Sequence, residues 1–182
     1  MARIVVRKSC MRNKNRLVFL AIFLACAMLI GIALYMQEQE GLEPCPMCIL
    51  QRYAFVAVGA VALVAAIHGP QGMLLRAYSA LVALLAVAGG GVSARHSYLQ
   101  HFPPKIESCG TDLEFLINTF PLSQALPKIF AGTGSCSKID WRMLGLTIPE
   151  WALVWFAAIA IAAAWVGFFA NKNAARSAAS AK

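Results

Sequence analysis

Charged residues are scarce in this chain, and acidic residues are the scarcest. Only 13% of its 182 residues are charged and only 8 are acidic, whereas soluble proteins carry about 25% charged residues. Apolar residues make up 60% of the chain, and the mean hydropathy is +0.67. This composition argues against a disordered chain, a soluble enzyme and a small domain held by disulfides.

The few cations are concentrated at the two ends of the chain. Six of the 16 lysines and arginines lie within residues 1–16, and three more follow residue 171. The sequence shows no basic face interleaved with aromatic side chains, the pattern typical of nucleic-acid binding. We therefore expect no nucleic-acid partner and interpret the basic tails as a sign of membrane topology.

Long apolar runs occur four times, at about 17–36, 49–67, 73–97 and 150–169. A helix needs about 20 mostly apolar residues to cross a bilayer, and each run approaches or exceeds that length. The sequence therefore predicts an all-α membrane protein, a bundle of four transmembrane helices that forms one domain over residues 17–170.

The distribution of Lys and Arg predicts how these helices are oriented. Cytoplasmic segments carry an excess of both residues, as do the tails 1–16 and 171–182, whereas the loop 37–48 has neither. Both tails should thus be cytoplasmic, and the loops 37–48 and 98–149 should face outward. Cleavage of a signal near Ala25-Cys26-Ala27 is the competing interpretation, but the apolar run continues well beyond it. One-faced spacing through Leu122, Leu126, Ile129 and Phe130 predicts a short helix in the second loop. This helix would lie flat on the outer membrane surface or pack over the helix bundle, and the two interpretations are compatible.

Four of the 6 cysteines fall on the predicted outer face, where disulfides persist. Cys45 and Cys48 form a C-x-x-C pair, and Cys109 and Cys136 lie far apart in the second loop. A disulfide within C-x-x-C closes a very short loop and removes little chain entropy, so this pair suits redox chemistry. The alternative is that the four outer cysteines form two structural disulfides. A zinc site would need further ligands beside the pair; the sequence shows none nearby, and we expect no metal.

The surroundings of Cys48 favour a reactive thiolate. Pro46 suits the first turn of a helix, which puts Cys45 near the N-cap and Cys48 in the first turn, where thiolates are stabilised. Arg52 follows one turn later on the same face, although an interfacial arginine alone would also explain it. His96 closes the third predicted helix at the same depth. It is a candidate donor to a bound carbonyl, or merely a capping residue.

Together these features resemble the DsbB family of bacterial disulfide bond formation proteins, over roughly residues 15–170. The resemblance rests on the C-x-x-C motif with its flanking residues, on the end of the third predicted helix, on the two loop cysteines and on the approach to the fourth helix. In this sequence these are Glu43 to Cys48, Gln51-Arg52, Arg95-His96, Cys109, Cys136, Leu144-Gly145-Leu146 and Pro149-Glu150-Trp151.

The resemblance implies a membrane enzyme of the bacterial inner membrane that oxidises thiols. Cys45 and Cys48 would be the pair that faces a quinone, and Cys109 and Cys136 the pair that faces a partner. Cys109 would form the mixed disulfide with a DsbA-like periplasmic protein of thioredoxin fold. Cys10 and Cys26 have no counterpart in the family pattern.

By the same resemblance, ubiquinone or menaquinone from the membrane pool would accept the electrons. Cys48 would lie nearest the quinone ring, with Arg52 and His96 beside it. The proline inside the C-x-x-C motif departs from the apolar residue that is commoner there. Three alternatives are a dithiol electron transporter, an enzyme like vitamin K epoxide reductase, and a scaffold with two disulfides.

Overall fold

Four long helices and one short hairpin make up the part of the chain that the structure describes. The structure is a computed structural model, and it describes residues 2–41, 44–102 and 141–179. In chain order the elements are α1 (Ala2–Glu40), α2 (Pro46–His68), α3 (Gly72–His101), β1 (Arg142–Met143), β2 (Leu146–Thr147) and α7 (Ile148–Ala179).

Each of the four helices is long and apolar enough to cross a membrane, which confirms the expected four-helix membrane bundle. The expected interfacial helix at 122–130 lies outside the described residues. At most a third of each apolar window is buried within the bundle, so most apolar side chains face outward, where lipid would cover them. The apolar stretches are Asn13–Gln39, Pro46–His68, Gly72–His101 and Ile148–Phe168.

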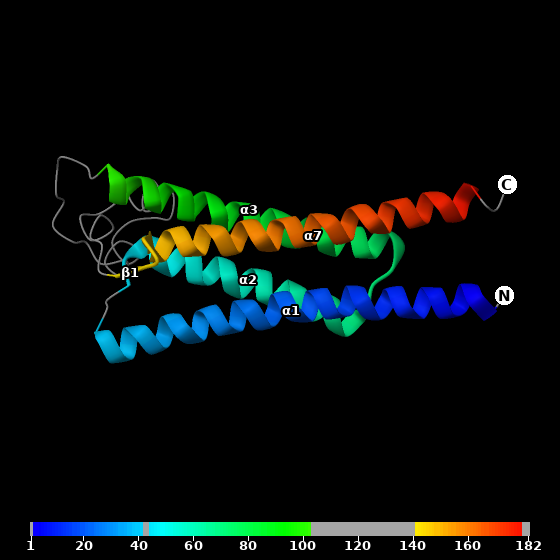
Figure 1. Cartoon of the computed structure of the whole chain (residues 1–182), viewed down its shortest axis with the longest axis horizontal. Coiled ribbons are helices and arrows are strands. Elements are labelled where there is room, and N and C mark those ends of the chain that lie inside the picture. Colours follow the sequence, from blue (N-terminus) through cyan, green and yellow to red (C-terminus); the bar gives the residue numbers. More distant parts are fainter. Residues whose placement is uncertain (1, 42–43, 103–140, 180–182) are drawn as a thin grey trace, which may run out of the picture.

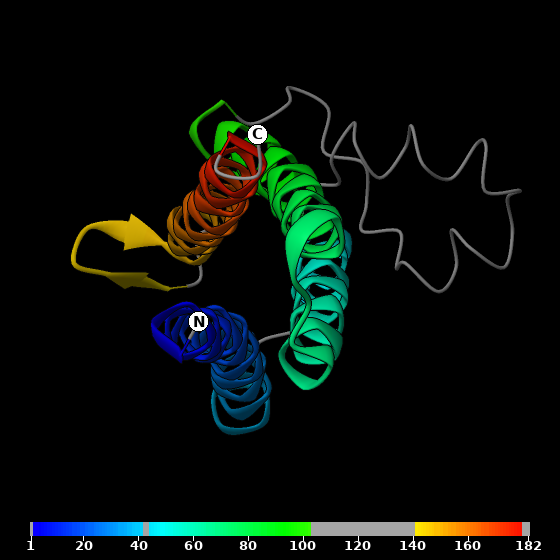
Figure 2. The same ribbon diagram turned by 90° about the vertical axis from the view of Figure 1, so that its right-hand side faces the viewer.

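The helices lie side by side, with both termini at the same end of the bundle (Figure 1). The opposite end, here called the cysteine end, holds the start of α2, the end of α3, the hairpin and the start of α7 (Figure 1). Seen along the bundle, α3 lies between α2 and α7, and α1 lies against α2 (Figure 2). Because α1 and α7 contact each other very little, the bundle is not closed on that side.

Small residues let the helices approach closely in the middle of the bundle. A Cβ added to Gly89 of α3 would lie 2.5 Å from the Phe156 ring of α7. That ring stacks on Phe55 of α2, with centroids 3.9 Å apart and an interplanar angle of 9°. Close approach at small residues is a common means of packing helices in membranes. This stack therefore joins α2, α3 and α7 in the middle of the bundle.

Polar contacts at the C-terminus of α2 connect the helices where the two chain termini lie. Gly69 ends this helix in the left-handed conformation, with φ of 57°, where glycine avoids the steric cost of a Cβ. Arg16 of α1 donates from Nε to the carbonyl of Ala66 at 2.8 Å. The positive guanidinium thus lies at the negative end of the α2 dipole, where a cation is stabilised. Nearby, Nδ1 of His68 lies 2.9 Å from the hydroxyl of Tyr78 on α3.

The hairpin before α7 was not predicted from the sequence, which assigned these residues to a loop. Leu144 and Gly145 form its two-residue turn with φ of 55° and 83°, the pattern of a type I′ turn. The carboxylate of Glu150 accepts from the backbone N–H of Thr147 at 2.7 Å and from its hydroxyl at 3.1 Å. This contact resembles half of a capping box and fixes where α7 begins.

We predict that Gly89→Ala destabilises the bundle, because the new methyl group must displace the Phe156 ring from its stack. Overpacking of this kind typically costs about 1–3 kcal/mol of unfolding free energy. The matched control is Gly91→Ala on the same helix, where a Cβ meets no atom within 4 Å. Unfolding titrations in mixed detergent micelles would measure both variants. Equal stability of the two would show that the ring moves aside without cost.

Candidate functional site

The C-x-x-C pair forms the first turn of α2. Cys45 is the N-cap, with φ of −64° and ψ of 161°, and its Sγ accepts from the backbone N–H of Cys48 at 3.4 Å. Pro46 occupies the first helical position, where its missing N–H breaks no helical bond. The expected place of Cys48 in the first turn is thereby confirmed. Its sulfur lies close to the positive end of the helix dipole.

The two sulfurs lie 3.0 Å apart but face different surroundings. Cys45 is 8% exposed and packs with Met47 and Leu99, whereas Cys48 is half-buried and lines a pocket. A disulfide is about 2.05 Å long, so a shift of about 1 Å would join the sulfurs. The pair therefore has one cysteine in the protein core and one on the wall of a pocket.

His96 of α3 contacts Cys45 and not the pocket. Its Nε2 lies 3.6 Å from Sγ of Cys45, and its Nδ1 lies 3.3 Å from the amide nitrogen of Gln51. Both His96 and Gln51 are buried, at 2% and 4% exposure. With the amide nitrogen as donor, Nδ1 accepts and the ring proton sits on Nε2, directed at the sulfur. His96 is therefore absent from the pocket lining, and the structure places it beside Cys45 instead of on the wall where a quinone ring was expected.

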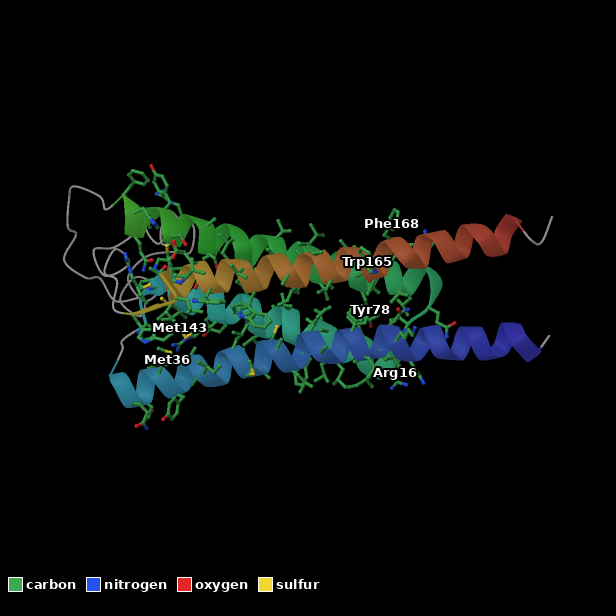
Figure 3. The ribbon with its side chains drawn as sticks, in the orientation of Figure 1. Arg16, Met36, Tyr78, Met143, Trp165 and Phe168 are labelled. Carbon is green, nitrogen blue, oxygen red and sulfur yellow. The ribbon has the colours of Figure 1, made fainter. Side chains whose placement is uncertain are left out.

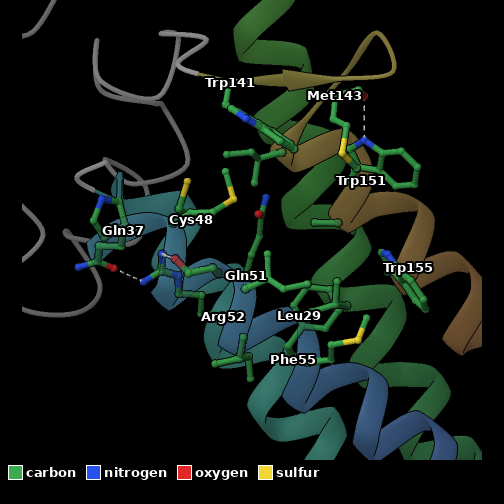
Figure 4. A pocket seen from close by; sticks show the side chains of 18 residues that line it. Leu29, Gln37, Cys48, Gln51, Arg52, Phe55, Trp141, Met143, Trp151 and Trp155 are labelled. Atoms are coloured by element: carbon green, nitrogen blue, oxygen red, sulfur yellow. Dashed lines mark hydrogen bonds between the residues drawn. The ribbon is translucent and has the colours of Figure 1, made fainter. Parts of the chain in front are cut away.

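Arg52 joins α2 to α1 at the mouth of the same pocket. Its Nη1 donates to Oε1 of Gln37 at 2.6 Å, and its Nη2 donates to the carbonyl of Ala33 at 3.3 Å (Figure 4). A guanidinium has five N–H donors, so these two bonds leave others for a ligand. The sequence placed Arg52 one turn from Cys48, and the structure shows both lining one pocket.

The pocket has a volume of about 390 Å³ and a mostly apolar wall, within the size range of small-molecule sites. Figure 4 shows Cys48, Gln51 and Arg52 on one side of it, and Trp151 and Trp155 on the other. The remaining lining comes from α1, the hairpin region and the facing parts of α2 and α7. These residues are Met28, Leu29, Ile30, Ile32, Ala33, Met36, Gln37, Pro44, Phe55, Trp141, Met143, Ile148 and Ala152.

The pocket opens on the side where the bundle is not closed. Its walls include α1 and α7, which hardly contact each other. Met28 and Ile32 of α1 and Ile148 of α7 line it and remain 55%, 47% and 38% exposed. Met36 of α1 and Met143 of β1 both line the pocket and lie near each other at the cysteine end (Figure 3). In a membrane this opening would face lipid.

Sequence reasoning missed several residues of the site. Gln51 was noted only as part of a motif, although a glutamine three residues after Cys48 within an apolar run was a usable signal. Trp151 and Trp155 follow one another at helical spacing, but nothing in the sequence shows that they face α1. The structure brings together Cys45, Cys48, Arg52 and His96, whereas 109 and 136 lie outside the described residues.

A C-x-x-C pair at a helix start, with one cysteine buried and the other on the wall of an apolar pocket between membrane helices, defines a membrane protein with a redox-type dithiol beside a site for an apolar ligand. Residues 15–166 match the family model of disulfide bond formation protein DsbB.

Curated relatives agree with this match. The chain is 52% identical over 157 residues to the disulfide bond formation protein B of Azoarcus sp. (strain BH72), which covers 86% of this chain and 94% of that protein. The protein of the same description from Aromatoleum aromaticum is 54% identical over 147 residues, covering 81% and 89%. That from Nitrosococcus oceani is 42% identical over 156 residues, covering 85% and 92%. The chain belongs to the DsbB family, and it is a membrane disulfide oxidoreductase of disulfide bond formation.

We predict that Gln51→Leu lowers the stability of the protein, because it leaves the buried Nδ1 of His96 without the amide. An unsatisfied buried polar group costs about 1–3 kcal/mol. The control is Gln71→Leu, since Gln71 is the exposed N-cap of α3 and makes no capping hydrogen bond with its side chain. Thermal unfolding in detergent would measure both. A loss as large for Gln71→Leu would contradict the role of the Gln51 contact.

Proposed function

We propose that the chain is a thiol:quinone oxidoreductase, which reoxidises a DsbA-like periplasmic protein and passes the electrons to ubiquinone or menaquinone. The observation that carries this proposal is the pocket wall, on which Cys48 lies beside the polar side chains of Gln51 and Arg52. No other described residue combines a thiol with a place on that wall.

The residues of the pocket fit a quinone head group. A flat apolar ring suits the aromatic side chains of Phe55, Trp151 and Trp155, and its carbonyl oxygens need donors, which Arg52 and Gln51 supply. The opening between α1 and α7 suits a lipid-soluble ligand with a long tail, because the tail can remain in the bilayer while the head group lies beside Cys48.

The chemistry divides between two cysteine pairs. The dithiol of the partner is oxidised as it reduces the disulfide between Cys109 and Cys136. The resulting dithiol reduces the disulfide between Cys45 and Cys48. When this second pair closes again, two electrons and two protons leave it, and a quinone bound in the pocket would take them up as quinol.

Each residue near Cys45 and Cys48 has a physical task in the last step. The first turn of α2 and the Arg52 guanidinium favour a thiolate on Cys48, which is the sulfur that lines the pocket. The imidazole of His96 stabilises negative charge on Cys45 through its Nε2 hydrogen, directed at that sulfur. Gln51 holds the imidazole in this orientation. Burial of Cys45 keeps water from competing for its sulfur.

The direction of electron flow requires a strong acceptor. A DsbA-type dithiol has a potential of about −120 mV, so a protein disulfide alone rarely oxidises it. A quinone in the bilayer supplies the driving force, and this accounts for a catalyst embedded in the membrane. The cysteine end would then face the periplasm and both termini the cytoplasm, in the inner membrane, as the distribution of cations predicts.

The test of the quinone site is Arg52→Gln. Loss of hydrogen bonds from a charged donor costs about 1.5–3 kcal/mol, so the KM for quinone should rise about tenfold or more in steady-state assays with quinone varied. Arg52→Lys should restore activity only in part, because an ammonium lacks the planar fork of donors. The first step, thiol exchange with the partner, should stay intact.

The matched control is Arg95→Gln at the same end of the bundle. The guanidinium of Arg95 lies over the ring of Tyr98, 5.4 Å from its centroid, and Arg95 is absent from the pocket lining. Its replacement should leave the quinone KM unchanged. An unchanged KM in Arg52→Gln as well would mean that Arg52 is only a structural tie between α1 and α2.

The partner-facing cysteine should be Cys109. A reduced DsbA-like protein with a single cysteine should attack the disulfide at Cys109, expel the thiolate of Cys136 and remain attached, because it lacks the second cysteine that resolves the adduct. Non-reducing electrophoresis and peptide mapping would locate the bond. Cys109→Ser is the control and should trap no partner. An adduct on Cys136 or Cys45 would overturn the assignment.

A further inference from the structure

Three metal-type ligand atoms converge at the start of α2. They are Sγ of Cys45, Sγ of Cys48 and Nε2 of His96, and all lie within 4.8 Å of one another. Two come from α2 and the third from α3. We propose that the chain, when this cysteine pair is reduced, binds one soft divalent cation of the Zn²⁺ or Cd²⁺ class through these three atoms. Closing the disulfide abolishes the site.

The sulfur–nitrogen distance at Cys45 already suits a tetrahedral site, whereas the distance between the two sulfurs must lengthen. With bonds of about 2.3 Å to sulfur and about 2.05 Å to nitrogen, tetrahedral angles place two sulfurs about 3.8 Å apart and a sulfur about 3.5 Å from a nitrogen. Sγ of Cys45 lies 3.6 Å from Nε2 of His96, and the two sulfurs are 3.0 Å apart. A small rotation of the Cys48 side chain, which is only half-buried, would open the sulfur pair to the required separation.

The ligand types select the class of cation. Thiolate and imidazole ligands suit soft or borderline ions such as Zn²⁺, whereas Mg²⁺ and Ca²⁺ require oxygen ligands. Two cysteines and one histidine with an open fourth position form a known type of zinc site. The sequence shows no further ligand close to the C-x-x-C motif, so no metal was expected. The structure brings a third ligand, His96, to the pair from α3.

Gln51 supplies the outer contact that such a site needs. A metal-bound histidine usually donates its other ring N–H to an oxygen, which fixes the tautomer. Here the Gln51 amide lies 3.3 Å from Nδ1 of His96. Rotating the amide by half a turn would present its oxygen to Nδ1–H, and Nε2 would then be free of its proton and directed at the sulfurs. The same glutamine can therefore support both tautomers of the ring.

Binding would compete with the redox chemistry without any electron transfer. Each thiol gives up its proton as it binds the cation, and both sulfurs keep their electrons in metal–sulfur bonds. Neither sulfur can then form the disulfide. Reversible inhibition of quinone reduction follows, and only this consequence depends on the proposed function; the binding site itself does not.

The experiment uses the full chain in detergent, with the other four cysteines replaced by serine. The protein is reduced, freed of reductant without oxygen and titrated with Co²⁺, whose thiolate charge-transfer absorption reports sulfur ligands. Zn²⁺ should displace Co²⁺ with one equivalent per chain. The same protein with its disulfide formed should not bind. Equal binding by the oxidised form, or no binding by the reduced form, would overturn the proposal.

Matched variants test the third ligand and its outer contact. His96→Gln should weaken Zn²⁺ binding at least about tenfold, since an outer contact alone is worth about 10–100-fold. His101→Gln is the control, because His101 is an exposed histidine near the end of the same helix. Gln51→Leu should weaken binding, and Gln51→Glu should strengthen it, because a carboxylate can only accept from Nδ1–H.

A misfolded variant would lose Zn²⁺ affinity, so the higher affinity expected of Gln51→Glu cannot result from misfolding. Undiminished affinity in His96→Gln would reduce the site to two cysteines and overturn the proposal. These titrations contain neither quinone nor partner. A failure of quinone reduction in metal-free protein would therefore contradict the proposed function alone.

Discussion

The first turn of α2 is the constraint on which the site depends. Cys45 caps the helix through its sulfur, and Pro46 makes the turn favourable at that position. This geometry brings the second sulfur within 3.0 Å of the first, although Cys45 is buried and Cys48 is half-buried on the pocket wall. One sulfur therefore faces His96 in the core and the other faces the pocket. A C-x-x-C motif in an open loop would lack this asymmetry.

The pocket exists because the bundle is left open on one side. The Phe55–Phe156 stack and the close approach at Gly89 hold α2, α3 and α7 together, but nothing comparable joins α1 to α7 in the described part of the chain. Near the pocket, Arg52 ties α1 to α2. Because α1 and α7 hardly pack against each other, an apolar ligand can enter from the bilayer and reach the thiol of Cys48.

The sequence predicted the features that depend on length and on local chemistry. Apolar runs long enough to span a bilayer gave the four helices, and Pro46 between two cysteines gave the N-cap. Contacts between distant segments were not predictable, because the register in which helices meet depends on side-chain fit. The depth of His96 followed from helix length, yet its contacts with Cys45 and Gln51 did not. The hairpin escaped prediction because Leu144 adopts a positive φ that leucine seldom takes.

The surroundings of His96 connect the two proposed roles of this site, electron transfer to a quinone and binding of a soft cation. With Nε2 protonated, the ring donates toward Cys45 and favours a thiolate that can give up electrons. With the proton on Nδ1, the same nitrogen offers a lone pair between two sulfurs, which suits a cation. The amide of Gln51 accommodates either tautomer, because it has a donor on one side and an acceptor on the other. A dithiol prepared for electron transfer by a buried imidazole is therefore also a ligand set for soft metals. Selectivity between the two depends on how quickly an oxidant re-forms the disulfide.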